Sequence, residues 1–268
     1  MCASGTNPPL CAGNDYAVKF ADNILRKDTK RNRASKRGPG YERNRVMEIK
    51  IVQNILHAND EIANENQAIF DSKGIVGFNL MSSPGSGKTY LLDTTLAMLA
   101  GELRAAVIEG DISTTLDAER LARHNVPLIQ INTDTVGGDC HLEASMVKAA
   151  LPRLDIEGLN LLFIENVGNL VCPADFDLGE HIKVALLSTT EGEDKPLKYP
   201  LMFRVCHVIL ITKIDLEGVL EFDTDKAEAN ARKINPNATV IRLSAKSGQG
   251  MDKWIDFLRA EVAKRKKP

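Results

Sequence analysis

The stretch that decides the fold is Ser82-Ser83-Pro84-Gly85-Ser86-Gly87-Lys88-Thr89. It follows the apolar run 75–81, precedes a helical pattern, and matches the phosphate-binding pattern G-x-x-x-x-G-K-S/T with serine at the first glycine position. The chemistry needs these residue types because backbone N–H groups of a glycine-rich turn and of a helix N-terminus must approach phosphate oxygens closely. The alternative is a turn that only joins a strand to a helix, and the intact Gly-Ser-Gly-Lys-Thr disfavours it.

We therefore predict a nucleoside triphosphate site. Lys88 would neutralise the β- and γ-phosphates, and the Thr89 hydroxyl would ligate Mg²⁺. The residues expected to bind phosphate are Pro84, Gly85, Ser86, Gly87, Lys88 and Thr89.

Short apolar runs alternate with helical stretches around this motif. The runs are 75–81, 105–108, 128–131, 161–164, 184–187, 208–211 and 239–243, and the helical stretches lie near 88–100, 115–124, 141–151, 225–234 and 251–264. Continuous apolar strands separated by helices are typical of a mainly parallel sheet covered on both faces. The sequence predicts an α/β P-loop NTPase fold, with ligands beyond the carboxyl ends of the strands.

The chain before this domain has a different composition. Residues 1–45 are rich in Gly, Pro and Asn and predict a flexible arm, whereas 46–70 has the spacing of an amphipathic helix that leads into a domain over 46–268. Residues 26–45 carry nine basic and two acidic side chains, although the formal charge of all 268 residues is −2. The arm is therefore partly basic and the remainder acidic.

Composition narrows the class of protein. With 43% apolar and 26% charged residues, the chain is neither wholly disordered nor collagenous. No apolar run approaches the ~18 residues that suggest a membrane helix. The start of the sequence has no signal pattern, so we expect a cytoplasmic protein without a membrane partner.

A nucleic-acid-associated protein is an alternative because of the basic arm, but the acidic remainder argues against it.

Two further motifs indicate which base is bound. The run 208–211 ends in Thr212-Lys213-Ile214-Asp215, a match to the guanine element N/T-K-x-D, and Ser244-Ala245-Lys246 follows the last apolar run. A carboxylate at Asp215 can accept two hydrogen bonds from guanine, a donor pair that adenine lacks. The residues expected to bind guanine are Thr212, Lys213, Asp215, Ser244, Ala245 and Lys246, and the expected cofactors are GTP or GDP with Mg²⁺.

Acidic residues at strand ends are candidates for the magnesium site. Asp111 ends one strand, and Glu165 and Gly168 occupy the place of the D-x-x-G element, so Glu165 would act through water and Gly168 would sense the γ-phosphate. Each acid could instead cap a helix or face solvent. The sequence has no equivalent of the water-orienting glutamine, and whether the stretch 166–169 orients water stays open. We expect slow hydrolysis and leave the catalytic group unassigned.

Cysteine and histidine residues suggest a second metal. Cys140, His141 and Cys172 offer thiolate and imidazole ligands suited to Zn²⁺ or Ni²⁺, and a symmetric dimer could complete their coordination. The alternative is buried cysteines and a hydrogen-bonded histidine. Cys2 and Cys11 on the arm form a candidate second site. Cys206 and the other histidines (His57, His124, His181 and His207) are expected to have structural roles.

The motifs taken together resemble the HypB family. The residues that carry the resemblance are 82–89, Glu109-Gly110-Asp111, Gly137-Gly138-Asp139-Cys140-His141, 165–173 and 190–200. The resemblance implies a GTPase that promotes nickel insertion into [NiFe]-hydrogenase, working with hydrogenase maturation factors on the large-subunit precursor. It also implies a metal site for Ni²⁺ or Zn²⁺ at Cys140, His141 and Cys172, within a nucleotide-dependent homodimer interface. Lys195 would reach the partner's nucleotide.

The sequence lacks two features that some members of this family carry, the N-terminal Cys-x-x-Cys-Gly-Cys motif and the histidine-rich tract. It also lacks the Cys-Pro-His motif of the related urease accessory GTPase, which disfavours that branch. A GTPase that protects a cobalamin enzyme is a third hypothesis. That function would not require Cys140, His141 and Cys172 as metal ligands.

Overall fold

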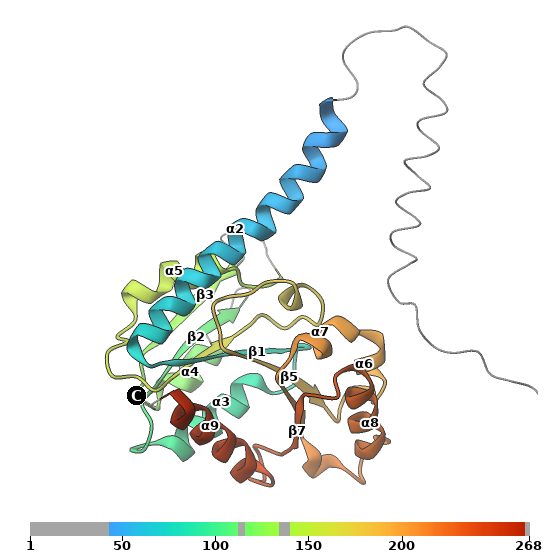
Figure 1. Ribbon diagram of the computed structural model, residues 1–268. Coiled ribbons are helices and arrows are strands. Elements are labelled where there is room, and N and C mark those ends of the chain that lie inside the picture. Colours follow the sequence, from blue (N-terminus) through green and yellow to red (C-terminus); the bar gives the residue numbers. More distant parts are fainter. Residues whose placement is uncertain (1–42, 112–115, 134–139, 266–268) are drawn as a thin grey trace, which may run out of the picture. The chain divides into compact units, whose positions relative to one another are not determined.

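A seven-stranded parallel sheet forms the centre of the computed structural model (Figure 1), which describes residues 43–111, 116–133 and 140–265. The strands stand in the order β3-β2-β4-β1-β5-β6-β7, and every neighbouring pair is parallel. The strands are β1 (Val76–Ser82), β2 (Ala105–Asp111), β3 (Leu128–Asn132), β4 (Leu161–Glu165), β5 (Ile182–Ser188), β6 (Val208–Thr212) and β7 (Thr239–Arg242).

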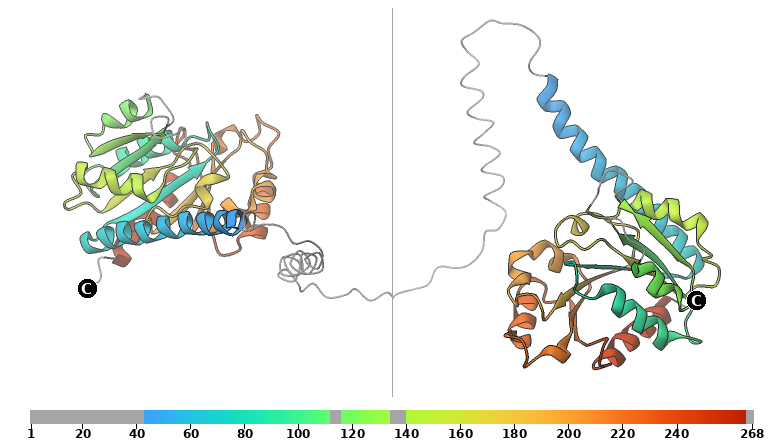
Figure 2. Two further views of the ribbon diagram at one scale, coloured as in Figure 1. Left: turned by 90° about the horizontal axis from the view of Figure 1, so that it is seen from above. Right: turned by 180° about the vertical axis from the view of Figure 1, so that it is seen from behind.

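Helices cover both faces of this sheet (Figures 1 and 2). The apolar core on one face includes side chains of α3, α4 and α9, and the cores on the other face include side chains of α2, α5, α7 and α8. The helices are α2 (Arg43–Lys73), α3 (Lys88–Leu99), α4 (Leu116–Ala122), α5 (Ala144–Ala150), α6 (Lys195–Lys198), α7 (Pro200–Val205), α8 (Thr224–Ile234) and α9 (Met251–Arg265). The predicted α/β fold is confirmed.

The order of the strands determines where the functional loops meet. β1 lies between β4 and β5, and every residue of β1, β4 and β6 is buried. Because carboxyl ends of parallel strands lie at one edge of a sheet, the loops after β1, β4 and β5 are neighbours there. The phosphate motif therefore emerges at the middle of that edge.

The predicted elements are found within a few residues of their expected positions. The leading helix begins earlier and ends later than predicted, and α5 begins at Ala144, so Cys140 and His141 precede it and do not start it. The sequence did not predict the short helices α6 and α7. Residues 1–42 of the predicted arm, with Cys2 and Cys11, lie outside the described residues. Among the residues that are described, no helix combines the length and apolarity that spanning a membrane requires.

Helix α2 packs tightly against the segment that leads into β5. Gly179 has a φ of 96°, and a β-carbon there would lie 2.6 Å from the β-carbon of Asn66 and 2.7 Å from the carbonyl oxygen of Ala63. Both the backbone conformation and the space therefore require glycine.

We predict that Gly179→Ala destabilises the protein by more than the roughly 1–2 kcal/mol of a left-handed residue alone, because the helix must also move. Gly248→Ala is the matched control, since Gly248 has a φ of 81° and open space around it. Urea denaturation of both variants measures the difference. Equal losses in the two variants would contradict the close approach of α2.

Candidate functional site

The phosphate loop has the backbone conformation that its glycines predict. Gly85 and Gly87 have φ values of 73° and 98°, and α3 begins directly after them at Lys88. A β-carbon at Gly168 would lie 2.9 Å from the α-carbon of Pro84, so the loop after β4 packs directly against the phosphate loop. The structure therefore brings the predicted phosphate-binding residues and Gly168 together.

The serine at the first glycine position has contacts of its own. The Ser82 hydroxyl donates to the Ser83 carbonyl (2.8 Å) and accepts hydrogen bonds from Lys88 Nζ (3.2 Å) and from the Ser86 hydroxyl. Glycine could not make these bonds. Serine in place of the first glycine thus places a hydroxyl within hydrogen-bond distance of Lys88, the lysine expected to bind the phosphates.

An acidic cavity lies beside the loop. Its volume is about 340 Å³, and its lining includes Lys88, Thr89, Asp111, Glu165 and Gly168. The Thr89 hydroxyl donates to Glu165 Oε1 over 2.8 Å, so the predicted Mg²⁺ ligands of the phosphate loop and of β4 are in direct contact. Asp111 lines the same cavity from the end of β2.

Glu109 belongs to this cavity, although the sequence analysis did not select it. It pairs in register with Glu165 across β2 and β4, and one carboxylate oxygen of each residue is buried without a hydrogen-bond partner among the described residues. Burial and the Glu165 and Asp111 carboxylates raise the pKa of Glu109 to about 8. Burial raises the pKa of Glu165 to about 7, although Lys88 and Thr89 act in the opposite direction. Unsatisfied buried oxygens fit a cation such as Mg²⁺.

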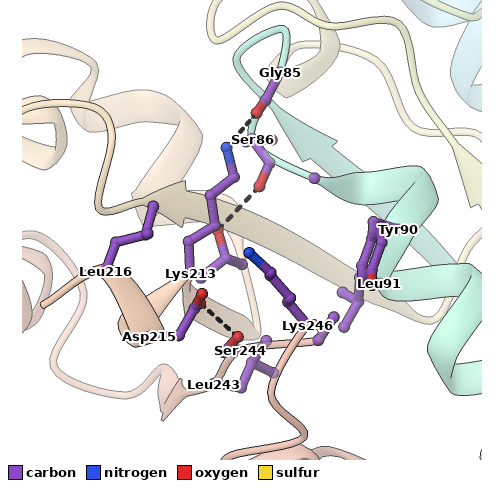
Figure 3. A pocket seen from close by; sticks show the side chains of 13 residues that line it. Gly85, Ser86, Tyr90, Leu91, Lys213, Asp215, Leu216, Leu243, Ser244 and Lys246 are labelled. Carbon is purple, nitrogen blue, oxygen red and sulfur yellow. Dashed lines mark hydrogen bonds between the residues drawn. The ribbon is translucent and has the colours of Figure 1, made fainter.

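A second cavity, of about 320 Å³, adjoins the phosphate loop (Figure 3). It contains all six residues that the sequence assigned to guanine: Thr212, Lys213, Asp215, Ser244, Ala245 and Lys246. Figure 3 shows that Lys213 donates to the Gly85 carbonyl (2.8 Å) and Ser244 to Asp215 Oδ1 (2.5 Å). Lys213 adopts a left-handed φ of 60° that turns the chain from β6 toward this cavity. The phosphate-loop residues 85–87 also line this cavity, as do Tyr90, Leu91, Leu216 and Leu243, which the sequence analysis did not assign to the base.

The three predicted soft-metal ligands converge. Ligand atoms of Cys140, His141 and Cys172 all lie within 4.8 Å of one another, and the two sulfur atoms are 2.9 Å apart. His141 Nε2 is buried without a hydrogen-bond partner among the described residues, and the ring packs against Phe176 with centroids 4.1 Å apart. The Cys140 thiol and burial raise the pKa of Cys172, so a metal ion must displace that proton. Two thiols and an imidazole, whose Nδ1 lies 4.0 Å from Cys140 Sγ, fit Ni²⁺ or Zn²⁺.

Lys195 begins α6, beside the phosphate loop of its own chain. Its Nζ lies 3.7 Å from Glu191 Oε2, and that carboxylate also accepts a hydrogen bond from the Ser83 hydroxyl (2.6 Å). Glu191 is a second residue that the sequence analysis missed. It lies in the segment 190–200 that carries the family resemblance, but its individual signal was an acid shortly after an apolar strand, which is a common pattern.

The residues expected to be structural have structural contacts. Cys206 is buried and donates to the Met202 carbonyl, which confirms it as a core residue. His124 contacts Asp93 (2.6 Å), His181 accepts from the backbone of Gly77, and His207 accepts from that of Lys183. His57 lies 3.4 Å from Glu61 on the exposed face of α2.

Comparisons with known proteins identify the family. A model of the nucleotide-binding domain of CobW/HypB/UreG matches residues 77–242. The hydrogenase maturation factor HypB of Escherichia coli K12 is 49% identical over 228 residues, which cover 85% of this chain and 77% of that protein. That of Azotobacter vinelandii is 52% identical over 224 residues, 83% of this chain and 72% of the relative. The chain is a member of the HypB family.

Solved HypB structures have the same fold. HypB from Archaeoglobus fulgidus is 39% identical with a TM-score of 0.72, and the match covers 77% of this chain and 99% of that one. HypB from Helicobacter pylori, solved in complex with nickel, is 36% identical with a TM-score of 0.73, over 79% of this chain and 98% of the other. The resemblance drawn from the motifs is confirmed.

The buried carboxyl groups predict how stability depends on pH. A carboxyl whose pKa is raised by folding binds more protons in the folded than in the unfolded state, so stability falls as pH rises from about 5 to about 8. We predict that Glu109→Gln raises the free energy of unfolding at pH 8, by on the order of a few kcal/mol, with little effect at pH 5. Urea titrations in EDTA at both values measure this. If the difference in the free energy of unfolding between Glu109→Gln and the wild type were the same at pH 5 and pH 8, Glu109 would not be buried and protonated.

Proposed function

We propose that this protein is a slow GTPase and metallochaperone that binds nickel or zinc and promotes nickel insertion into [NiFe]-hydrogenase. One observation supports this most strongly. The segment 165–172 begins at Glu165, which is hydrogen-bonded to Thr89 of the phosphate loop, and ends at Cys172 of the cysteine–histidine cluster. A single short segment thus contacts both sites, as a protein that times metal release by hydrolysis requires.

The phosphates and Mg²⁺ occupy the acidic side of the site in this proposal. Gly85, Gly87 and the α3 N-terminus donate backbone N–H groups, and Lys88 neutralises the β- and γ-phosphates. Thr89 and Asp111 would bind Mg²⁺, and Glu165 would act directly or through water. Glu109, protonated while the site is empty, would add negative charge only if the bound cation displaced its proton. Gly168, packed on Pro84, lies where the loop can respond to the γ-phosphate.

The base occupies the second cavity. Asp215 accepts two hydrogen bonds from guanine, and its carboxylate is oriented by the hydroxyl of Ser244. Thr212 and Lys213 hold the phosphate loop through Ser86 and Gly85, so the base pocket and the phosphate site share one framework. Water then attacks the γ-phosphate to give GDP and phosphate, slowly, because no glutamine stands at the usual water-orienting position.

The cargo metal is held by Cys140, His141 and Cys172. Three ligands leave tetrahedral coordination incomplete, and a symmetric homodimer through the metal and nucleotide face would supply further ligands. In such a dimer Lys195 would leave Glu191 and reach the partner's nucleotide. The nickel complex of the Helicobacter pylori HypB supports nickel as the cargo. The expected partners are hydrogenase maturation factors and the large-subunit precursor.

The remaining predictions concern the organisation and location of the chain. We expect a partly basic arm over 1–45, a GTPase domain over 46–268 and a cytoplasmic location. Cys2 and Cys11 stay a predicted second metal site, because they lie outside the described residues.

Base recognition is tested by Asp215→Asn. An amide cannot accept both guanine N–H groups, so we expect the affinity for GTP to fall by at least about 100-fold. The affinity for xanthosine triphosphate should rise, because its additional carbonyl accepts from the new amide. Displacement of a fluorescent GDP analogue measures both. Asp223→Asn, at the exposed N-cap of α8, is the matched control and should bind GTP normally. Unchanged GTP affinity in Asp215→Asn would exclude guanine from this cavity.

Metal binding is tested by titrating nickel and zinc with and without GTP and Mg²⁺. The titrations use a background in which Cys2 and Cys11 are serine, so that only the remaining thiols compete. We expect Cys140→Ala and Cys172→Ala each to abolish stoichiometric binding, whereas Cys206→Ala, the same change in the core, retains it. If both ligand variants kept the wild-type stoichiometry, the metallochaperone function would be wrong.

A further inference from the structure

Asn166 lines the phosphate site and is hydrogen-bonded to the loop that carries Cys140 and His141. It follows Glu165, is 1% exposed and lines the acidic cavity of the phosphate site. Its Oδ1 accepts hydrogen bonds from the backbone N–H of Leu142 (3.1 Å) and of Val167 (3.0 Å). Leu142 directly follows the metal ligand His141. One side chain therefore joins the loop after β4 to the loop that carries two of the three metal ligands.

The same side chain has little capacity left to orient a water molecule. Two donors occupy its carbonyl oxygen, and its Nδ2 donates to Asn79 Oδ1 over 3.3 Å. A carboxamide oxygen has two lone pairs, so its acceptor capacity is filled. The geometry thus favours a connecting role for Asn166 over the water-orienting role that its sequence position left open.

A second, weaker link runs parallel to the first. Asn169 donates from Nδ2 to the carbonyl of Cys140 (3.4 Å) and accepts from the backbone of Val171 (2.8 Å). Both asparagines belong to the segment between Glu165 and Cys172. That segment is thus tied at two points to the loop of Cys140 and His141.

We propose that Asn166 is the positioning residue through which the phosphate site and the metal site are coupled. This inference rests on the proposed function, because it assumes GTP in one site and nickel in the other. If Mg²⁺ and the γ-phosphate, which Glu165 and Gly168 would contact, displaced either residue, Asn166 would move with its neighbours. The buried Leu142 N–H cannot be left without an acceptor, so Leu142 and the adjacent His141 follow.

Asn59 of α2 provides an internal comparison. Its Oδ1 accepts from the backbone N–H of Ala144 (2.9 Å), two residues beyond Leu142, and its Nδ2 donates to the Asp177 carbonyl (2.8 Å). Asn59 therefore supports the start of α5, directly after the loop of Cys140 and His141, with the same kind of bond. It does not line either nucleotide cavity. Removing the Asn59 side chain should make the loop of Cys140 and His141 more mobile, while the hydrogen bond between Asn166 and Leu142 still joins that loop to the phosphate site.

The experiment measures the nickel dissociation constant by competition with a chromophoric chelator, with Mg²⁺ alone and with Mg²⁺ plus GTPγS. We expect the two constants of the full-length wild type to differ by a factor in the range of about 5–150 that is usual for coupled sites. In Asn166→Ala the ratio should fall below about 2. Asn59→Ala should weaken nickel binding in both conditions and keep the wild-type ratio. If Asn166→Ala does not fold, Asn166→Ser, which retains a polar group too short to reach Leu142, should show the same loss.

Three results would overturn the inference. The first is an Asn166 variant that keeps the wild-type ratio of nickel dissociation constants with and without GTPγS. The second is an Asn59→Ala protein whose ratio falls as far as that of the Asn166 variant, because any substitution that makes the loop more mobile would then have the same effect. The third is a wild type that binds both ligands with a ratio of one, in which case the two proposed sites stand and only their coupling fails. Failure of the wild type to bind GTPγS or nickel would instead refute the proposed function. By linkage, nickel must change GTPγS affinity by the same factor, which checks the ratio independently.

Discussion

The hydrogen bond between Thr89 and Glu165 is the contact on which the rest of the site depends. It joins the first turn of α3 to the end of β4, and β4 lies directly beside β1 in the sheet. Because the phosphate loop and the loop after β4 meet there, the packing of Gly168 on Pro84 and the contacts of Asn166 are possible. The parallel topology with β1 in the middle places these loops at one edge.

Two buried glutamates at adjacent strand positions would destabilise an ordinary core. Glu109 and Glu165 are 2% and 4% exposed, and each has an unpaired oxygen within the described part of the chain. Such groups persist where a bound cation or nucleotide compensates for their desolvation. The buried glutamates of the acidic cavity therefore lower the stability of the fold in favour of binding, and Lys88 and Arg120 are the cationic residues that line this cavity.

The sequence predicted the sheet because buried parallel strands produce apolar runs that are easily recognised. Motifs marked the residues that the structure brings together in the cysteine–histidine cluster and in the cavity proposed for guanine. It did not predict α6 and α7, which are 4 and 6 residues long and begin near prolines, too short for a helical period to show. Glu109 was missed because its importance comes from its register with Glu165, which exists only once the strands pair. The bonds of Asn166 and Glu191 depend on long-range packing for the same reason.

The two cavities have different relations to the metal site. The cavity proposed for guanine is built from the phosphate loop, the start of α3 and the ends of β6 and β7, and it contains no residue of the segments 140–144 or 165–172. The acidic cavity contains residues 165–168 of the second segment. Under the proposed function, the base would therefore set which nucleotide binds without contacting the segments of Cys140, His141 and Cys172. Only the phosphates would lie beside residues 165–168, so the difference between GTP and GDP, and not the base, is the signal that the proposed arrangement would carry to these three residues.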